Sequence, residues 1–242
     1  MITIFMSVLN EENFLESAVE NTIKAARNAG NIKLDIVIVD DASTDKTPEV
    51  IRKLEKKYSF IRSIHHKQNQ GLGTGIKEVI KIAKYPKFMI VPGDNDADVD
   101  LLTRLMRARN KADLILSYYL NKESRSRWRN FISMIYGLIY MITFDVYVQY
   151  INSPCVYTTK ILKTFDIKSS RFSITAEIAV KYLRSGVTLY EMPGLMQTGA
   201  EGSASLKPEN LLEIIVIYFR LVYEIFLEKR LLFNKKYIRV ID

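Results

Sequence analysis

The sequence predicts an α/β fold in which a mostly parallel, Rossmann-like sheet is flanked by helices. Short apolar runs alternate with segments of helical periodicity through the first 120 residues. The apolar runs are nearly continuous, as expected for strands that are buried on both faces. Two acidic clusters and a glycine-rich stretch follow three of these runs, at the carboxyl ends of the predicted strands. Ligands bind at that edge in sheets of this kind.

Strands and helices are expected in alternation along this first part of the chain. The apolar runs that predict strands are Ile2–Val8, Leu34–Val39, Ile61–His65, Phe88–Val91 and Asp113–Ser117. Helical spacing of apolar residues predicts helices over Glu12–Ala29, Thr47–Tyr58, Gly75–Ala83 and Leu101–Arg109. Asn10 or Asn13 is a candidate cap for the first helix, and the sequence Thr-Pro-Glu is a favourable start for the second.

Two long apolar segments mark the second part of the chain. Phe131–Phe144 carries no Lys, Arg or Glu, and as a helix it would span roughly 21 Å, less than the ~30 Å core of a bilayer. Leu211–Phe233 is long enough to cross, but Glu213, Arg220, Glu224 and Glu228 interrupt it in one polar stripe. Each such charge would cost roughly 2.5–3.5 kcal/mol at the bilayer centre. The second segment is therefore expected to lie against the core or in a membrane interface as an amphipathic helix.

Charge and composition limit the class of partner. The chain has 242 residues, 48% of them hydrophobic, and a net charge of +8, which favours one sizeable core and an anionic partner. Basic residues cluster after the C-terminal helix, at Lys229, Arg230, Lys235, Lys236 and Arg239. Such a cluster suits an anionic membrane surface; the alternative is a solvated basic rim around core helices. Nucleic acid is disfavoured because no basic stripe is interleaved with aromatic residues.

The cysteine count and the N-terminal residues indicate the cellular compartment. Cys155 is the only cysteine, which excludes an intramolecular disulfide and suits a reducing compartment. The first residues lack a basic leader and are interpreted as a buried strand, so no signal peptide is expected.

The stretch VPGDNDADVD is the most acidic in the sequence. A calcium loop of the EF-hand type that began at Asp94 would require Gly at position 99 and Glu at position 105, where Val and Leu stand. Asp94 and Asp96 lie two residues apart on an extended segment, so both carboxylates can face one divalent cation that also binds phosphate oxygens. Asp98 and Asp100 are expected at the following helix start. The alternative is a polar turn with no ligand.

Four segments together resemble a known family. VLNEE, VDDASTD, GLGTG and the triplet Asp94-Asn95-Asp96 occur in the order found in family 2 glycosyltransferases of the GT-A fold. Among these, the chain is most similar to the dolichyl- and polyprenyl-phosphate sugar transferases. The resemblance covers about residues 1–120 and implies a GT-A fold that binds a nucleotide-sugar. Residues 121–210 would then form the acceptor-binding half, and residues 211–242 the C-terminal helix and basic tail.

The resemblance assigns roles in donor binding. Asp41 resembles the residue that accepts a hydrogen bond from the base, and Asp94 with Asp96 resembles the motif that binds Mg²⁺ or Mn²⁺, with Asp96 in a catalytic role. Gly71 and Gly73 would let the chain pass close to the ligand. The remaining donor-binding candidates are Leu9, Glu11, Asp40 and Asn95. Turn geometry alone accounts for Ser43, Thr44 and Asp45.

Acceptor binding is expected in the second half of the chain. Arg125, Arg127 and Arg129 precede an apolar helix, as in the family, and could hold a lipid phosphate by bidentate contacts. Glu177 resembles an acidic residue that faces the donor sugar, and Ser203 a residue near the diphosphate. The chain departs from the family pattern at Tyr150, Pro154 and Thr198. His65 and His66 end a short strand and are expected at the surface.

The function implied is transfer of a sugar from GDP-mannose or a UDP-hexose to a polyprenyl or dolichyl phosphate. The reaction would invert the anomeric carbon, depend on a metal, and take place at the cytoplasmic face of a membrane, with the protein peripheral or free in the cytoplasm. A hydroxyl acceptor on a glycan or small molecule is the first alternative, and Glu177 is then the candidate base. A nucleotide-binding relative without activity is the second.

Overall fold

A computed structural model describes residues 1–121, 127–151, 154–195 and 208–241, with only the backbone for Arg129 and residues 208–211. The described strands form one sheet in the order β3-β2-β1-β4-β6-β5-β7-β8. Strand β6 runs antiparallel to β4 and β5, and the other pairs are parallel. The strands are β1 (Ile2–Val8), β2 (Leu34–Asp40), β3 (Ile61–His65), β4 (Lys87–Ile90), β5 (Leu114–Tyr119), β6 (Cys155–Thr158), β7 (Thr188–Gly194) and β8 (Ile238–Arg239).

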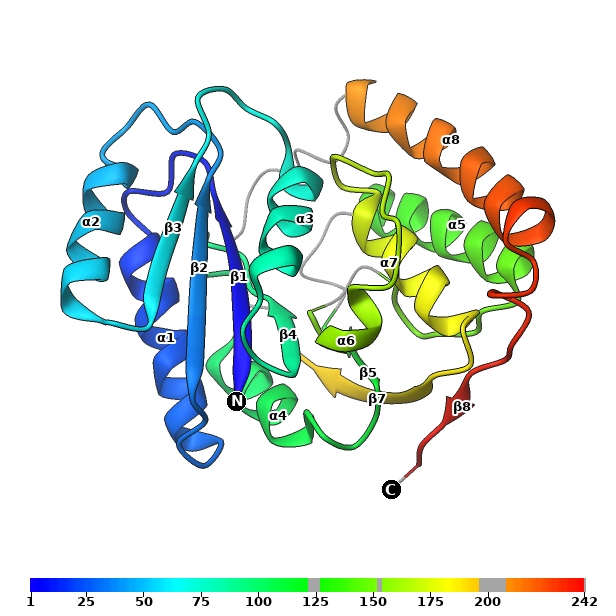
Figure 1. Cartoon of the computed structure of the whole chain (residues 1–242), viewed down its shortest axis with the longest axis horizontal. Coiled ribbons are helices and arrows are strands. Elements are labelled where there is room, and N and C mark those ends of the chain that lie inside the picture. Colours follow the sequence, from blue (N-terminus) through cyan, green and yellow to red (C-terminus); the bar gives the residue numbers. More distant parts are fainter. Residues whose placement is uncertain (122–126, 152–153, 196–207, 242) are drawn as a thin grey trace.

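Helices cover both faces of this sheet, so the predicted α/β fold is confirmed (Figure 1). They are α1 (Leu15–Asn28), α2 (Thr47–Lys57), α3 (Leu72–Ile82), α4 (Val99–Ala108), α5 (Arg127–Phe144), α6 (Thr159–Leu162), α7 (Ile174–Leu183) and α8 (Pro208–Tyr223), which continues as the π-helical turn η3 (Glu224–Glu228). Helices α1, α2 and α4 pack on one apolar cluster. Helices α3 and α5 to α8 pack on a second cluster on the other face.

Local sequence explains the start of α4 but not that of α1. Asp98 caps α4 as expected, because its Oδ2 accepts the backbone N–H groups of Asp100 at 3.0 Å and Leu101 at 3.2 Å. The predicted caps of α1 are wrong: the helix begins after Phe14 without a side-chain cap. Asn10 instead accepts the N–H of Thr44 at 2.8 Å, because the loops after β1 and β2 lie together.

Helix α3 begins earlier than the sequence predicts. It starts at Leu72, three residues before the expected start at Gly75, so Gly73 and Gly75 lie inside the helix. Gly71 precedes it with φ of +86°, a conformation that favours glycine. The helix therefore begins beside the loop after β2, where Gly71 donates its N–H to Asp41 at 2.8 Å.

Helices α5 and α8 lie side by side on one flank of the molecule (Figure 1). The ring of Tyr218 on α8 meets the rings of Tyr140 and Phe144 on α5 edge to face, and its hydroxyl lies 2.7 Å from Thr143 Oγ1. Within the described ranges, every helix is too short or too polar to cross a membrane.

Candidate functional site

The acidic residues of the predicted donor site meet at one edge of the sheet. Strands β2, β1 and β4 are neighbours, and the loops that follow them carry Asp41, Glu11 and Asp94. Backbone hydrogen bonds join these loops: Asp41 donates to Val8 O at 3.0 Å, and Gly93 donates to Ser7 O at 3.2 Å. The edge is thus built where β1 and β2 end level with each other and the chain after β4 continues beside β1.

The loop after β4 is fixed against the end of β1. A Cβ at Gly93 would lie 2.4 Å from Val8 Cγ1, so only glycine allows this approach. Beyond it, Asp94 is exposed and its Oδ1 accepts the N–H of Asp96 at 3.1 Å. Asn95, expected to bind substrate, has φ of +60°, and its side-chain oxygen accepts a hydrogen bond at 2.9 Å from Asn21 on α1. Its amide is engaged by the protein.

The electrostatics of this edge suit a hard cation. Partial burial raises the pKa of Glu11, and the negative charges of Asp94 and Asp45 raise it further. Carboxylate oxygens are the donors that Mg²⁺ and Mn²⁺ prefer. The described residues contain no ready-made cluster of three His, Cys, Asp or Glu ligands. A cation at Asp94 and Asp96 would thus need phosphate oxygens or water to complete its shell.

The segment VDDASTD is largely tied to itself and to the β1 loop. Asp40 accepts the N–H of Ser43 at 2.9 Å and lies 3.0 Å from His65 Nδ1. Asp45 accepts the N–H groups of Thr47 at 2.9 Å and Glu12 at 3.2 Å. The turn role expected for Asp45 is therefore observed, and Asp40 has a comparable role.

Asp41 fixes the loop between β3 and α3. It is buried, and its Oδ1 accepts the N–H of Gln70 at 2.7 Å while its Oδ2 accepts the N–H of Gly71 at 2.8 Å. Its Oδ1 also lies 2.7 Å from His66 Nδ1. The residue that the sequence assigns to base recognition thus holds the loop at the start of α3.

His66 is not the surface residue that the sequence predicts. Its side chain is only 4% exposed, and its Nε2 lies 2.9 Å from Glu78 Oε2 on α3. Because ionised carboxylates only accept hydrogen bonds, both contacts are hydrogen bonds when both ring nitrogens carry protons, so this site favours the imidazolium form. Burial opposes this charge, but the bonds to Asp41 and Glu78 outweigh it and raise the pKa of His66. No local pattern signals this role, since the partners lie 25 and 12 residues away.

The glycines at the start of α3 are required by the protein itself. A Cβ at Gly71 would lie 2.5 Å from Ser170 O, and a Cβ at Gly73 would lie 2.6 Å from the carbonyl carbon of Ser170. Ser170 O also accepts the N–H of Gly73 at 2.8 Å. Close approach to the turn at residues 168–173 is thus sufficient to require these glycines, and the expected approach to a ligand stays a prediction.

Glu177 also differs from the prediction of a side chain that faces the donor sugar. It is buried on α7, where its Oε1 lies 2.8 Å from Lys181 Nζ and its Oε2 accepts the N–H of Ser169 at 2.8 Å. Because buried protein groups occupy both oxygens, the carboxylate is poorly placed to take a proton from an acceptor. Its role in this structure is to hold the turn at residues 168–173.

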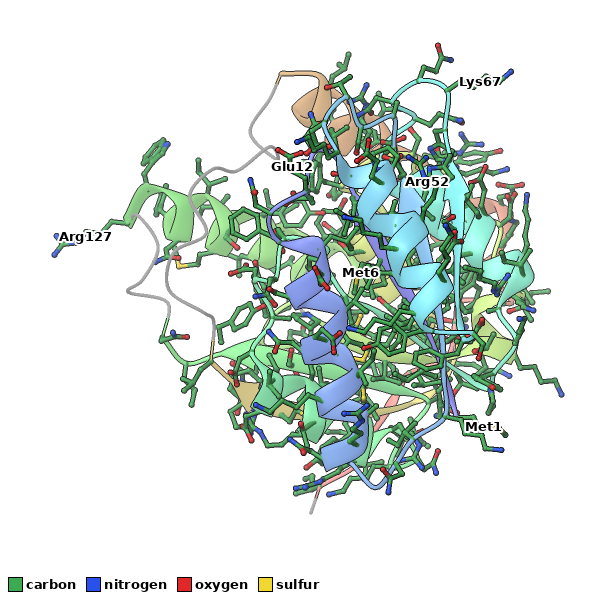
Figure 2. The ribbon with its side chains drawn as sticks, turned by 90° about the vertical axis from the view of Figure 1, so that its left-hand side faces the viewer. Met1, Met6, Glu12, Arg52, Lys67 and Arg127 are labelled. Carbon is green, nitrogen blue, oxygen red and sulfur yellow. The ribbon has the colours of Figure 1, made fainter. Side chains whose placement is uncertain are left out.

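The predicted acceptor residues are placed only in part. Arg127 lies at the exposed start of α5 and projects away from the body of the molecule (Figure 2). Arg129 belongs to the same helix, whereas Arg125, Thr198 and Ser203 lie outside the described residues. Leu9 follows β1 and is exposed at the donor edge. The arginine cluster therefore stays a prediction.

The sheet, its acidic edge and the flanking helices together define a GT-A fold, and comparison with known proteins identifies the family. Residues 3–168 match the family profile described as "Glycosyl transferase family 2". Because this match covers more than half of the chain, the protein belongs to glycosyl transferase family 2. Solved structures share the fold. Staphylococcus aureus TarS in complex with UDP-GlcNAc superposes over 92% of this chain and 66% of its own, with a TM-score of 0.63 and 17% identity.

A second solved structure shares the fold, and two sequence relatives resemble the chain. Glucosyl-3-phosphoglycerate synthase of Mycobacterium tuberculosis, crystallised with Mn²⁺ and UDP-glucose, gives a TM-score of 0.66 at 13% identity over 92% of this chain and 79% of its own. Dolichyl-phosphate beta-glucosyltransferase of Trichomonas vaginalis is 28% identical over 148 residues, which cover 57% of this chain and 45% of that protein. Dolichol-phosphate mannosyltransferase of Pyrococcus furiosus is 23% identical over 232 residues, 91% of this chain and 63% of its own. The chain thus spans less than two thirds of these two relatives.

Proposed function

We propose that this protein transfers a sugar from a nucleotide-sugar, GDP-mannose or a UDP-hexose, to a polyprenyl or dolichyl phosphate at the cytoplasmic face of a membrane. One observation carries the proposal. The acidic edge formed after β1, β2 and β4 lies in the same molecule as α5 and α8, two adjacent helices that expose apolar side chains. A water-soluble donor suits the first feature, and a lipid acceptor suits the second.

The donor half rests on the carboxylates at the sheet edge. Asp94 and Asp96 would hold Mg²⁺ or Mn²⁺ together with the diphosphate of the donor. A divalent cation bound there would offset the negative charge that develops on the departing nucleoside diphosphate. Glu11 and Asp41 border the same edge and would line the nucleoside pocket, as in the family resemblance.

The proposal of a lipid acceptor rests on apolar side chains that are exposed on α5 and α8, where their contact with water is unfavourable. Helix α5 exposes Trp128, Phe131, Met134, Ile135, Leu138, Ile139 and Ile142, and α8 exposes Leu212, Ile215, Val216, Phe219 and Tyr223. We call this set the apolar face. Large exposed apolar patches mark contact with a protein or a membrane. Arg127 on α5 and Arg220 on α8 are exposed on the same two helices, and the basic residues Arg230 and Lys236 follow η3 in the sequence, which favours an anionic lipid surface.

The orientation of α8 strengthens this argument. The sequence places Glu213 and Glu224 in a polar stripe that would ordinarily face water. Instead Glu224 is buried, where its Oε2 lies 2.9 Å from Lys181 Nζ, and Glu213 accepts hydrogen bonds from residues 170–173. These carboxylates are directed into the protein while Phe219 is directed outward. The apolar outer face of such a helix is more stable in the interfacial region of a bilayer than in water.

The reaction itself needs little proton transfer. A lipid phosphate is already ionised at neutral pH, so one of its oxygens can attack the anomeric carbon directly. The new bond forms from that oxygen to the anomeric carbon, and the bond to the donor diphosphate breaks with its electron pair leaving on the diphosphate. This single in-line displacement inverts the anomeric centre. The protein's task is to position both substrates and to stabilise the diphosphate.

The proposal is tested by a transfer assay with radiolabelled GDP- and UDP-sugars, polyprenyl phosphate and Mg²⁺ or Mn²⁺. Lipid-linked sugar is the expected product, and transfer only to hydroxyl acceptors would contradict the lipid assignment. Membrane seating is tested separately by co-sedimentation with vesicles of phosphatidylglycerol and phosphatidylcholine. Phe219→Ser should weaken it, whereas Phe14→Ser should not, since Phe14 is also exposed (53% against 65%) but lies at the start of α1.

A second candidate acceptor is a glycan hydroxyl. Its support is the similarity to poly-beta-1,6-N-acetyl-D-glucosamine synthase of Staphylococcus aureus, 28% identical over 99 residues that cover 41% of this chain and 23% of that protein. The burial of Glu177 weighs against this candidate, because a hydroxyl acceptor needs a base. The screen above separates the two acceptors directly.

A further inference from the structure

A single carboxylate on α8 holds the turn that abuts the start of α3. Glu213 Oε1 accepts the N–H groups of Ser170 and Arg171, each at 2.8 Å, and its Oε2 accepts the hydroxyl of Ser173 at 2.7 Å. Ser173 is buried, and the backbone donors at Ser170 and Arg171 are partly buried. We call residues 168–173 the serine turn.

The serine turn in turn touches the donor edge. Ser170 O accepts the N–H of Gly73 at 2.8 Å and leaves no room for a side chain at Gly71 or Gly73. Gly71 donates its own N–H to Asp41 Oδ2 at 2.8 Å. Direct contacts therefore run from α8 through the serine turn and Gly71 to Asp41, the residue expected to bind the nucleoside.

Loss of the Glu213 carboxylate would disturb this path specifically. Without the carboxylate, the backbone N–H groups of Ser170 and Arg171 would lose their acceptor, and the serine turn would move to find another. Because the turn fits closely against Gly71 and Gly73, its movement would shift the loop that Asp41 holds. The other carboxylate that holds the turn, Glu177, bonds to Lys168 and Ser169 and leaves residues 170–173 to Glu213.

We propose that Glu213 is a positioning residue of the donor site and that it connects lipid seating of α8 to nucleotide affinity. The second half of this statement rests on the proposed membrane function. The residues that surround Glu213 along the helix, Leu212, Ile215 and Val216, belong to the apolar face. A lipid surface that binds this face fixes the helix, and the fixed helix fixes the serine turn.

The test measures the Kd of UDP and of GDP with Mg²⁺ by calorimetry, with and without anionic vesicles. Wild type should bind one of the two nucleotides, and vesicles should tighten that binding several-fold. Glu213→Gln keeps the size of the side chain but places an amide among N–H and O–H donors. It should weaken binding about tenfold, as expected for ~1.4 kcal/mol, and should lose the response to vesicles while still co-sedimenting with them.

Controls separate the outcomes. Glu228→Gln makes the same change at an exposed position of η3 and should behave as wild type. Glu213→Asp retains the charge and should recover part of the affinity. Urea unfolding checks that the variants are folded. If Glu213→Gln does not fold, the nucleotide affinity of Glu213→Asp decides whether Glu213 positions the donor site.

Three results would overturn the inference. The first is wild-type nucleotide affinity in Glu213→Gln. The second is a vesicle effect that survives this substitution. The third is wild-type protein that binds vesicles without any change in Kd. If wild type binds no vesicles, membrane seating fails and the coupling fails with it, while the vesicle-free Kd still decides the positioning role. If wild type binds neither nucleotide, the proposed donor function itself fails.

Discussion

Replacement of His66 by Gln tests the contribution of the His66 ion pairs with Asp41 and Glu78 to stability. The imidazolium bridges Asp41 and Glu78, with Nδ1 and Nε2 at 2.7 and 2.9 Å from their carboxylates. A glutamine side chain in its place would carry its donors on one nitrogen and could not reach both partners. The substitution therefore leaves Asp41, which is buried, without its positive partner.

The expected magnitude follows from the exposure of each partner. A charge-assisted hydrogen bond to a buried group such as Asp41 contributes about 1.5–3 kcal/mol. The side chain of Glu78 is 37% exposed, so solvent reduces its share to about 0.5–1 kcal/mol. The free energy of unfolding should fall by about 2–4 kcal/mol, which corresponds to a decrease in Tm of roughly 4–16 °C for a chain of this size.

The effect should depend on pH with a defined sign. The pKa of His66 is raised in the folded protein, so the stabilisation is fully present below the unfolded value of about 6.5. It is lost as the pH rises through the higher folded value. Urea unfolding from pH 5.5 to 9 should therefore show wild type and His66→Gln converging as the pH rises.

A matched control is available at the neighbouring residue. His65 pairs with Asp40, but its side chain is 43% exposed, so solvent screens this pair. His65→Gln should cost less than about 1 kcal/mol. The reasoning is refuted if His66→Gln is no less stable than His65→Gln at pH 6, or if the difference between wild type and His66→Gln grows as the pH rises.

Three further predictions concern the metal edge, the serine turn and the buried charges. Asp94→Asn should weaken Mg²⁺-dependent nucleotide binding at least about tenfold without altering binding in EDTA; equal losses in both conditions would argue against a cation there. Gly73→Ala should lower stability by about 1–3 kcal/mol through the clash with Ser170 and weaken nucleotide binding, and a wild-type Kd would show that the turn does not position the site. Lys181→Met removes the buried cation between Glu177 and Glu224 and should cost about 3–5 kcal/mol in urea unfolding, whereas a neutral effect would mean that the carboxylates take up protons readily.

The sequence was sufficient for β1 to β5 and for the place of the acidic edge, whereas β6, β7 and β8 were not predicted. Strand β3 begins and ends where the sequence predicts, and β1 does as well. Both are apolar runs bounded by polar residues, so the signal is local and strong. Caps were less predictable: Asn10 has the right chemistry for a cap, but a loop 34 residues away uses its side chain.

The roles of individual polar side chains followed only from contacts across the chain. Glu177 and His66 each carry a recognisable functional group, yet their partners come from other elements. Lys181 lies one turn along α7 from Glu177, but the contact of Glu177 with Ser169 requires the serine turn to fold back. Gly73 is conspicuous in sequence, whereas the backbone that demands it belongs to residue 170.

The amino-acid order alone determined the family, the alternating α/β pattern and the carboxylates at the strand ends, because periodicity and short motifs are properties of neighbouring residues. Tertiary structure decided which way α8 faces, that Asp41 and Glu78 enclose His66, and that Glu213 holds the serine turn. The physical reason is that buried hydrogen bonds and ion pairs form between groups brought together by packing. Helix periodicity gave α8 its two faces, but only the partners on α7 and in the serine turn show that Glu213 and the following Glu224 of η3 are directed inward.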